Sequence, residues 1–422
     1  MRLQFTIALL LAALTTLSAQ DPWQAGARYR AYSWVTPDTG EVFLRVGGRY
    51  GYAATPGKFP AHLQDGADLI LPHDVVLEGA RAATVTLEKV LSHEDTRDLT
   101  IAFNGHAPIA VPEPAAVPAP QPDYMYHTDV RVDVPLDYLR PGRANRFRLA
   151  VDTAQRWGWP QNVFYAVTLH VYYEPAAAGT SATALDYPHA EAVPLESTVR
   201  LRGVQPADAA AEYAFEGLDV DWGGTGANRR VHYQTFRAAP HHTLGRSEER
   251  ASRFAVRWHT AWLPDQPGAM RLHARVRDTT GLWRVLAPLP LKRLAPRPYG
   301  VHVVRAEPAP ANWVTRADTF AQRYHLDVAP ERVDAYRLHW TSWSPCYANG
   351  VYLNDHLLWM RNEACYVYDA HTLTFDDDHS LHFLEAGANV VHTGKTPLVR
   401  GQMVHGMEVQ WPGIQLLVRV RE

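Results

Sequence analysis

The chain has 422 residues, with 41 Lys and Arg against 44 Asp and Glu and a formal net charge of −3. Such a balance gives no overall field that would attract nucleic acid or an anionic membrane, so bulk charge does not support a polyanion-binding role. This length exceeds what one hydrophobic core usually organises. It predicts two or three domains, of which three fits better.

The first 19 residues have the pattern of a secretory signal peptide. One Arg precedes an apolar run from Phe5 to Leu17, which ends in small residues near Ser18 and Ala19. The run is too short to span a bilayer, and no later segment offers a long apolar stretch without charges. We therefore expect cleavage after Ala19 or Gln20, and a secreted or periplasmic protein without a membrane span.

The rest of the chain is predicted to be all-β. Strands of alternating polarity, such as RFRLAV and VTLHVYY, recur between Gly, Pro, Asn and Asp, and long helical periodicity is nearly absent. A small, uncharged stretch at 176–185 ends a first domain, predicted over 20–180. A Pro-rich stretch near Leu294 separates a middle segment, 187–294, from a third domain, 298–422. The middle segment has the size of an immunoglobulin-like sandwich.

The middle segment contains an Asp-x-Asp pair, Asp219 and Asp221, directly before a glycine-rich turn. Oxygen ligands two residues apart on a loop can face one hard cation, which makes a structural calcium one interpretation. The other is a polar turn capped by the Asp side chains, because the further acidic ligands of an EF-hand loop are missing.

The two cysteines of the chain, Cys346 and Cys365, flank the segment GVYLNDHLLWM. Two cysteines in an exported chain favour a disulfide, and antiparallel strands can bring such a pair within bridging distance. A zinc site using both thiolates would need a different spacing and compartment. The sequence therefore predicts a Cys346–Cys365 disulfide in the third domain.

One pattern of strands and turns occurs twice. Both copies have a strand, an Asn-Gly or Asn-Asp tip, a second strand, a Leu-x-x-Gly turn ending in Asn, and a Trp-Pro element before an apolar strand. The first copy comprises 99–111, 134–151 and 157–173, and the second comprises 350–360, 381–392 and 411–420. A unit that repeats its turn chemistry usually repeats its fold, so we expect two domains of one architecture.

This pattern resembles the galactose-binding-like β-sandwich, which serves as a sugar-binding accessory domain in many glycoside hydrolases. The resemblance covers about half the chain in two patches. It implies a jelly-roll of antiparallel strands, often with a structural calcium, and ligand-binding loops at one end or on a shallow face. The expected fold class is all-β, with tandem β-sandwiches in the order jelly-roll, immunoglobulin-like, jelly-roll.

The turn residues of the repeated pattern also have a purely structural interpretation. Asn-Gly supplies the positive φ of a hairpin, and Gly-x-Asn supplies a turn before a strand. This interpretation applies to Asn104, Gly105, Asn354, Gly387 and Asn389.

Aromatic and polar residues gather before the closing strand of each copy and beside Cys346. Loops at such positions can present a ring to the apolar face of a sugar, with amide and guanidinium groups for its hydroxyls. Alternatively, the Trp side chains plug the ends of the sandwiches. The candidate ligand-binding residues are Arg156, Trp157, Trp159, Gln161, Asn162, Trp343, Tyr347, Glu408 and Trp411.

The expected function is noncatalytic binding of a polysaccharide or other glycan. Two other classes stay open: a glycoside hydrolase or lyase whose site lies at a domain interface, and a structural or adhesive surface protein. Glycoside hydrolysis needs two carboxyl groups at a set separation, which sequence spacing cannot establish. No catalytic residue is therefore predicted. The charge balance predicts no nucleic-acid partner, and the one cofactor considered is the calcium of the Asp pair.

Overall fold

The computed structural model describes residues 21–36, 44–46, 69–71, 74–92, 99–112, 128–151, 162–175, 182–220, 229–231, 235–240, 243–308, 310, 313–315, 319–343, 350–360, 368–394, 407–410 and 413–422. Within these ranges the chain is nearly all β, and α1 (Asp378–Leu381) is the one α-helix. The antiparallel sheets form sandwiches, which confirms the predicted all-β class. The part of the chain described contains no helix long and apolar enough to cross a membrane.

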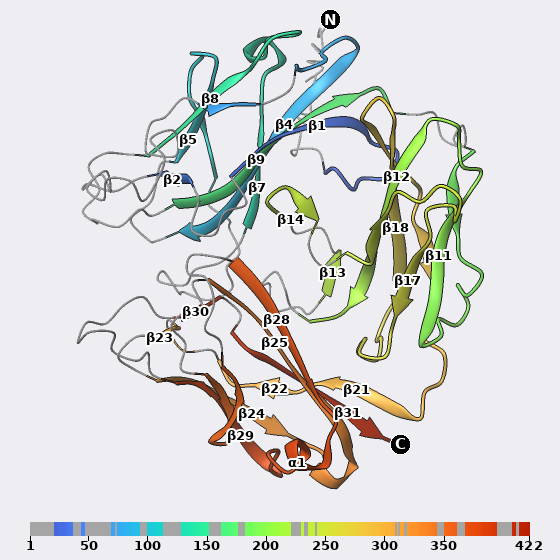
Figure 1. The fold of residues 1–422 in the computed structure, drawn as a ribbon, viewed down its shortest axis with the longest axis vertical. Coiled ribbons are helices and arrows are strands. Elements are labelled where there is room, and N and C mark those ends of the chain that lie inside the picture. The colour runs from blue at the N-terminus through green and yellow to red at the C-terminus, as the bar shows by residue number, and fades with distance from the viewer. Residues whose placement is uncertain are drawn as a thin grey trace, which may run out of the picture.

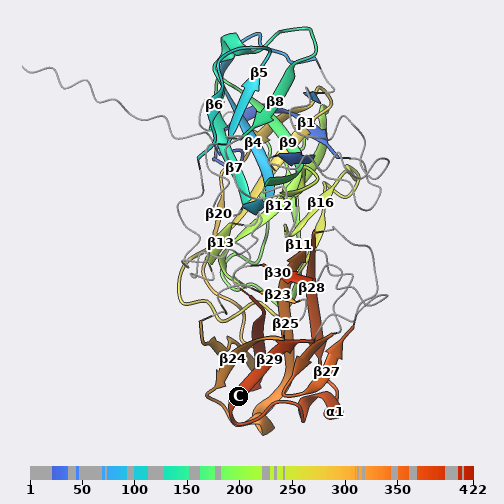
Figure 2. The same cartoon turned by 90° about the vertical axis from the view of Figure 1, so that its left-hand side faces the viewer.

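Figure 1 shows an N-terminal sandwich at the top, a middle sandwich at the right and a C-terminal sandwich at the bottom. Figure 2, viewed from the left-hand side of Figure 1, shows the N-terminal sandwich at the top and the C-terminal sandwich at the bottom. Each has its own hydrophobic core.

The N-terminal sandwich packs part of a large sheet against a four-stranded sheet. Its strands are β1 (Arg28–Val35), β2 (Leu44–Val46), β3 (Leu69–Ile70), β4 (Ala80–Ser92), β5 (Thr100–Phe103), β6 (Ile109–Ala110), β7 (Thr128–Asp133), β8 (Arg146–Ala150) and β9 (Asn162–Tyr173). The first layer has the order β1-β9-β4-β7, and the second has β3-β8-β5-β6. Side chains alternate along the strands, so Val85, Ile101 and Phe147 fill the core between the layers.

The middle sandwich packs the sheet β10-β11-β17 against β12 and β18. Its strands are β10 (Ala184–Asp186), β11 (Glu196–Arg202), β12 (Asp208–Leu218), β13 (Arg229–Val231), β14 (Thr235–Phe236), β15 (Ala239–Pro240), β16 (Gly245–Ser247), β17 (Val256–His259), β18 (Met270–Asp278), β19 (Leu282–Val285) and β20 (Leu289–Leu291). Tyr213, Phe215 and Trp258 are buried in its core, and the Tyr213 hydroxyl donates to the carbonyl of Phe254 at 2.7 Å.

The C-terminal sandwich packs a six-stranded sheet against a five-stranded one. The first contains β21 (Tyr299–Val303), β23 (Val314–Thr315), β25 (Val333–Trp343), β28 (Tyr368–Phe375), β30 (Met407–Val409) and β31 (Gln415–Arg421). The second contains β22 (Arg305–Ala306), β24 (Phe320–Leu326), β26 (Val351–Leu353), β27 (His356–Trp359) and β29 (Gly387–Thr393). Leu338, Trp340 and Val391 are buried between the two sheets.

The N-terminal and C-terminal sandwiches share one strand order. The order β1-β9-β4-β7 in one corresponds to β21-β31-β25 with β28 beside β25 in the other. In the opposing layers, β3-β8-β5-β6 corresponds to β24-β29-β26-β27. The repeated sequence pattern therefore corresponds to a repeated fold.

The hairpin tips of both copies have the same backbone conformation. Asn104 and Gly105 follow β5 with φ of 52° and 83°, and Asn354 and Asp355 follow β26 with φ of 47° and 67°. Two successive positive φ angles belong to a type I′ turn, which Asn, Asp and Gly adopt at least cost. The tip residues thus have the turn role that their sequence predicts.

A hydrogen-bonded asparagine pair ties the tip of the first copy to the turn before β8. The Asn104 Nδ2 donates to Oδ1 of Asn145 and to the carbonyl of Tyr138, both at 2.8 Å. The Asn104 Oδ1 accepts from the backbone N–H of Arg146 at 3.0 Å. Asn145 is fully buried and both accepts from and donates to the backbone of Arg140, at 2.8 and 3.0 Å.

The second copy repeats these bonds atom for atom. The Asn354 Nδ2 donates to Oδ1 of Asn389 and to the carbonyl of Phe383, both at 2.8 Å, and its Oδ1 accepts from the N–H of Val390 at 2.8 Å. Asn389, also fully buried, accepts from and donates to the backbone of Glu385 at 2.9 and 2.8 Å. These shared roles fix which residues of the two sandwiches are equivalent.

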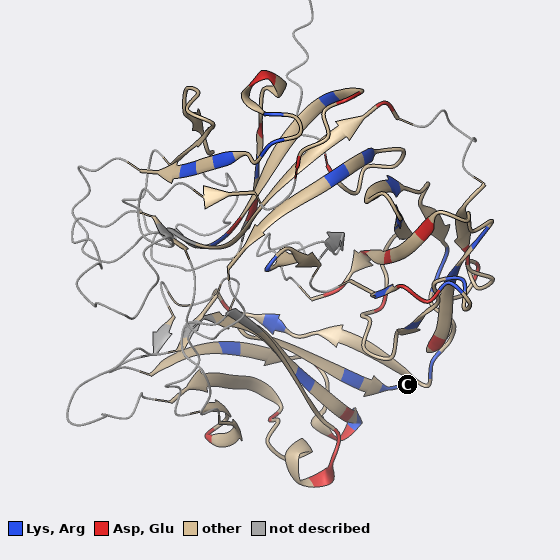
Figure 3. Cartoon of the chain, turned by 45° about the horizontal axis from the view of Figure 1, so that its top comes forward, with Lys and Arg blue, Asp and Glu red and all other residues tan. Residues whose placement is uncertain are grey.

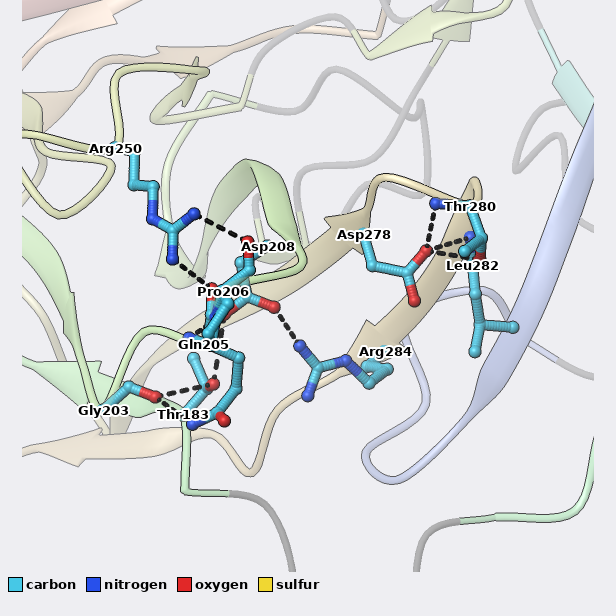
Figure 4. A network of polar contacts seen from close by, with 10 residues as sticks. All are labelled: Thr183, Gly203, Gln205, Pro206, Asp208, Arg250, Asp278, Thr280, Leu282 and Arg284. Carbon is cyan, nitrogen blue, oxygen red and sulfur yellow. Dashed lines mark hydrogen bonds and ion pairs between the residues drawn. The ribbon is translucent and has the colours of Figure 1, made fainter.

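The N-terminal and middle sandwiches share a sheet. β1 pairs with β9 along its length, and its first residues, Arg28 to Arg30, also pair with β19. Figure 4 shows the polar network beside this junction, in which Asp208 accepts from the N–H of Gln205 at 2.8 Å and forms an ion pair with Arg284 of β19. The buried Asp208 carboxylate therefore anchors the start of β12 to β19, the strand of the middle sandwich that pairs with β1.

The β14–β15 hairpin of the middle sandwich adds a second contact to the N-terminal sandwich. The N–H and Oγ1 of Thr235 donate to Asp129 at 3.1 and 2.8 Å. The N–H groups of Arg237 and Ala238 donate to the two carboxylate oxygens of Glu88 at 2.8 and 3.0 Å. Burial, together with the neighbouring Asp129 charge, raises the pKa of Glu88 to about 8.

Candidate ligand-binding cleft

A cleft of about 320 Å³ lies between the middle and C-terminal sandwiches. Its apolar back is formed by Phe215 and Trp258, which belong to the core of the middle sandwich. Its polar lining comes from both sandwiches: Asp219, Thr243, Arg257, His259, Arg337, His339 and Thr372. Trp262 and Leu417 complete the wall where the two sandwiches meet.

The C-terminal wall of the cleft follows from strand alternation in β25. Leu338 and Trp340 point into the core, so Arg337 and His339 project from the opposite face. Threonines of the neighbouring β28 hold both side chains, because Arg337 and His339 lie opposite Thr374 and Thr372 in the register. The Arg337 Nε donates to the Thr374 hydroxyl at 2.9 Å, and the His339 Nδ1 lies 3.0 Å from the Thr372 hydroxyl.

Trp262 fixes the orientation of the Arg337 guanidinium. The guanidinium carbon lies 4.3 Å from the centre of the half-buried indole, within cation–π range. Arg419 of β31 lies on the same indole at 5.8 Å and is held by Asp334, whose Oδ1 accepts from its Nε at 2.6 Å. The Arg337 guanidinium is thus pre-oriented by a ring and a hydroxyl, while its Nη atoms make no hydrogen bond within the described ranges.

The electrostatic balance of the cleft rests on Arg337 and Asp219. Burial lowers the pKa of Arg337 to about 10, and the Asp219 carboxylate across the cleft opposes this shift. Asp219 itself accepts from the N–H of Val220 at 2.8 Å. The cleft therefore has a hydrogen-bond donor, the Arg337 guanidinium, on one wall and an acceptor, the Asp219 carboxylate, on the other. This arrangement suits a ligand whose hydroxyl groups can both accept and donate hydrogen bonds.

A second cavity, of about 210 Å³, lies between the N-terminal and middle sandwiches. Its charged groups bond to one another: the Nε of Arg275 donates to Glu212 at 2.7 Å, and its Nη1 donates to the Tyr29 hydroxyl at 2.7 Å. The Arg275 guanidinium carbon also lies 4.5 Å from the ring centre of Trp23 and 4.8 Å from that of Trp283. This network is an internal one that joins two sandwiches, whereas the cleft presents its polar groups to an open space.

Most of the predicted ligand residues lie outside the described residues: Arg156, Trp157, Trp159, Gln161, Tyr347 and Trp411, together with Asp221, Cys346 and Cys365. Asn162 begins β9, while Trp343 ends β25 and lies directly opposite Glu408 of β30 in the register. The backbones of Trp343 and Glu408 are therefore neighbours, and Trp343 lies four residues beyond His339 of the cleft on the same strand.

Asp219 is the one predicted metal ligand that the structure describes, and it lines the cleft. The described residues contain no group of three or more His, Cys, Asp or Glu side chains placed to share a metal ion. The calcium interpretation of Asp219 and Asp221 stays a prediction.

Sequence reasoning missed Arg337 and Thr372. The alternation in YRLHW indicates that Arg337 and His339 share a face opposite Leu338, which a closer inspection of the strand could have found. That this face lies against the middle sandwich depends on the packing of two domains, for which the sequence carries no local signal.

No protein-family model matches the chain, and neither does any curated protein. Among solved structures, a β-porphyranase of glycoside hydrolase family 86 from the human gut bacterium Bacteroides plebeius aligns with 58% of this chain and 38% of its own, at 8% identity and a TM-score of 0.23. An FMN-binding β-glucuronidase from Facaelibacterium prausnitzii L2-6 aligns with 68% and 40%, at 11% identity and a TM-score of 0.21.

Fibronectin(III)-like modules of Clostridium thermocellum CbhA align with 53% of this chain and 98% of their own, at 12% identity and a TM-score of 0.17. This chain spans only 28% of a polysaccharide deacetylase from Bacillus cereus, at a TM-score of 0.18. Similarities of this size assign neither a family nor a function.

Proposed function

We propose that the protein is an exported, noncatalytic carbohydrate-binding protein, and that the cleft between the middle and C-terminal sandwiches holds a glycan. The observation that carries this proposal is the Arg337 guanidinium, oriented by Trp262 and Thr374 so that its Nη edge is available to a ligand. Sugars present neighbouring oxygens that a planar, pre-oriented guanidinium can bind through two parallel hydrogen bonds.

The remaining polar groups of the cleft complete this recognition. Asp219 accepts hydroxyl protons, while Thr372 and the imidazole groups of His259 and His339 can donate or accept. Among the aromatic residues that line the cleft, the half-buried Trp262 can contact sugar C–H groups, whereas Phe215 and Trp258 are 1% and 4% exposed. We propose further that the two outer sandwiches are galactose-binding-like domains, an assignment that their shared strand order and paired asparagines support.

The lining favours binding over hydrolysis. Retaining and inverting glycosidases need two carboxyl groups across the scissile bond. Asp219 is the only carboxylate among the described residues that line the cleft. Incubation of the purified protein with each bound glycan should therefore release no reducing ends, and their release would show that the protein is an enzyme.

A glycan array followed by calorimetric titration tests the proposal. Arg337→Gln should weaken binding of the selected glycan by roughly 10-fold to 100-fold, because hydrogen bonds to a charged group contribute roughly 1.5–3 kcal/mol. Trp262→Phe should weaken binding less, since it keeps an aromatic ring under the guanidinium. The matched control is Arg323→Gln, which removes an exposed strand arginine from the opposite sheet of the same sandwich.

Two results would overturn the assignment of the cleft. One is unchanged affinity in Arg337→Gln while the thermal melt matches that of the wild type. The other is equal loss in Arg337→Gln and Arg323→Gln, which would reflect charge alone.

A further inference from the structure

A groove of about 440 Å³ lies on the outer face of the four-stranded sheet of the N-terminal sandwich. Its floor is made of small side chains, Thr100, Ala102 and Ala150, which alternate with core residues along β5 and β8. Ala102 lies opposite Arg148 in the register, and Thr100 lies opposite Ala150. The space above these residues is open because none of the three fills it.

Three arginines surround this floor. Arg146 and Arg148 leave the same face of β8 two residues apart, and Arg140 stands at the end of the strands. The Nη2 of Arg140 donates to the backbone carbonyl of Asn104 at 3.3 Å, which holds this guanidinium at the rim. No carboxylate is present among the described residues that line the groove. Figure 3 shows the basic bands on β8 at the upper left.

The equivalent face of the C-terminal sandwich has a different lining. The shared asparagine network pairs Asn104 with Asn354 and Asn145 with Asn389, so Tyr352 stands at the position of Ala102 and His392 at that of Arg148. The rings of Tyr352 and His392 stack at 4.8 Å with an interplanar angle of 2°. They cover the sheet where the first copy is open.

The other two arginines are also replaced in the C-terminal copy. Arg140 and Glu385 each donate their backbone N–H to the buried Asn, and Arg146 and Val390 each donate to the Asn at the tip. The same backbone arrangement therefore presents three arginines around an open floor in the N-terminal copy. In the C-terminal copy the equivalent positions hold Glu385, Val390 and His392, and His392 stacks on Tyr352. The turn network does not require the arginines, since the second copy forms it without them.

We propose that this groove binds an acidic sugar, through a carboxylate or sulfate group held by Arg140, Arg146 and Arg148. Guanidinium groups bind planar or tetrahedral oxyanions through paired hydrogen bonds, and several around one open floor concentrate positive potential there. A flat floor of Thr and Ala leaves room for the ring that carries the anion. This site rests on the proposed glycan binding and adds to it a second site, which recognises an anionic group through a local cluster of arginines that the net charge of the whole chain does not reveal.

Three probes test the groove on the full chain: trigalacturonate, a sulfated galactose trisaccharide and neutral galactotriose. Calorimetric titration at low salt should show binding of one or both charged probes that is at least about tenfold tighter than that of the neutral probe. The stronger of the two identifies carboxylate or sulfate as the preferred group. Sodium chloride at high concentration should weaken the charged probes only, because screening acts on the ionic contacts.

Two variants locate the binding. Arg146→Gln with Arg148→Gln should weaken the charged probe by about tenfold or more. Ala102→Tyr with Arg148→His should abolish binding by covering the floor with the pair that the C-terminal copy has in the same place. Both replacements lie on an exposed strand face, and thermal melts verify the fold. Arg323→Gln, on the matching outer face of the C-terminal sandwich, serves as the control and should bind as the wild type does.

The outcomes separate this proposal from the cleft. Charged probes that bind no tighter than the neutral one, or bind equally to the wild type and to both groove variants, would overturn the groove. Equal competition by single-stranded DNA of matched charge would also overturn it, since the face would then be a general anion surface. Loss of binding in Arg337→Gln, with the groove variants unaffected, would support the cleft alone.

Discussion

The two outer sandwiches agree in their interior turns and differ on their outer faces. Asn104 with Asn145 in the first copy, and Asn354 with Asn389 in the second, make the same bonds to the backbone. On the sheet above them, one copy has an open, arginine-lined floor and the other a stacked Tyr-His pair. Buried polar groups must find partners, which constrains the turn, whereas a solvent-facing strand position tolerates almost any side chain.

The attachment of the outer sandwiches to the middle one also differs. The N-terminal sandwich shares a sheet with it through β1 and adds the carboxylate contacts of Glu88 and Asp129. The C-terminal sandwich contacts it through an apolar cluster that contains Val220, Val301 and Leu417. The cleft therefore lies at the junction made by side-chain packing and not at the one made by a continuous sheet.

The largest expected effect tests whether the two turns are energetically equivalent. Asn145→Ala and Asn389→Ala should each destabilise the protein by roughly 3 kcal/mol, because each removes a buried amide that satisfies several part-buried backbone groups. Chemical denaturation of the full chain, followed by circular dichroism, measures both. The surface replacements Asp133→Ala and Asp327→Ala are the controls. A large loss at one Asn with none at the other would break the equivalence of the copies.

The next prediction concerns the disulfide predicted for the C-terminal copy, a bond that the N-terminal copy cannot form because it contains no cysteine. The described ladder of β25 and β28 ends with Trp343 opposite Tyr368. Cys346 lies three residues beyond Trp343 in the sequence and Cys365 three residues before Tyr368, and both lie outside the described residues.

Closing a loop of about 20 residues should stabilise the C-terminal sandwich by roughly 3 kcal/mol. Replacement of both Cys346 and Cys365 with Ala should therefore lower the melting temperature under oxidising conditions, and a reducing agent should lower it similarly in the wild type alone. Titration with a thiol reagent under native and denaturing conditions measures the bridge directly. Two free thiols in the denatured, unreduced protein would show that no bridge exists.

The third prediction concerns pH and the N-terminal junction. The pKa of Glu88 is raised to about 8, so between about pH 4.5 and 8 the folded protein holds a proton that the unfolded chain releases. Its contribution to stability is present at low pH and falls as pH rises through this window. The melting temperature of the wild type should therefore fall more steeply from about pH 5 to 8.5 than that of Glu88→Gln.

His170 has the opposite dependence and remains in both proteins. Burial lowers its pKa to about 3, so the stability tied to its neutral form is lost as pH falls below about 6.5. The comparison of wild type with Glu88→Gln removes this shared contribution. Parallel melting curves across the range would show that Glu88 is ionised when folded.

The smallest expected effects concern the Trp residues before the closing strands. If Trp157, Trp159 and Trp411 stack on sugars, replacing each with Ala should weaken glycan binding by roughly 1 kcal/mol and leave the melt unchanged. If they plug the ends of the sandwiches, the same changes should cost roughly 3–5 kcal/mol of stability. Calorimetric titration paired with thermal melts separates the two, and unchanged values in both would remove these residues from the site.

The sequence alone determined the all-β class and the repeat, because both depend on local chemistry. Strand alternation in RFRLAV and the positive φ of Asn104 and Asn354 are properties of short segments, and the structure shows them as predicted. The predicted ligand residues were chosen by local composition too. Trp343 and Glu408 lie opposite each other in the register, and the residues that would complete their group lie outside the described ranges.

Only the tertiary structure decided which polar residues meet. Asp219 and Arg337 lie far apart in the sequence and face each other across the cleft because two sandwiches pack there. Arg140, Arg146 and Arg148 form one basic groove in a chain whose total charge is close to neutral. Composition records how many charges a chain has, while the sheet register and the packing of domains determine where those charges gather.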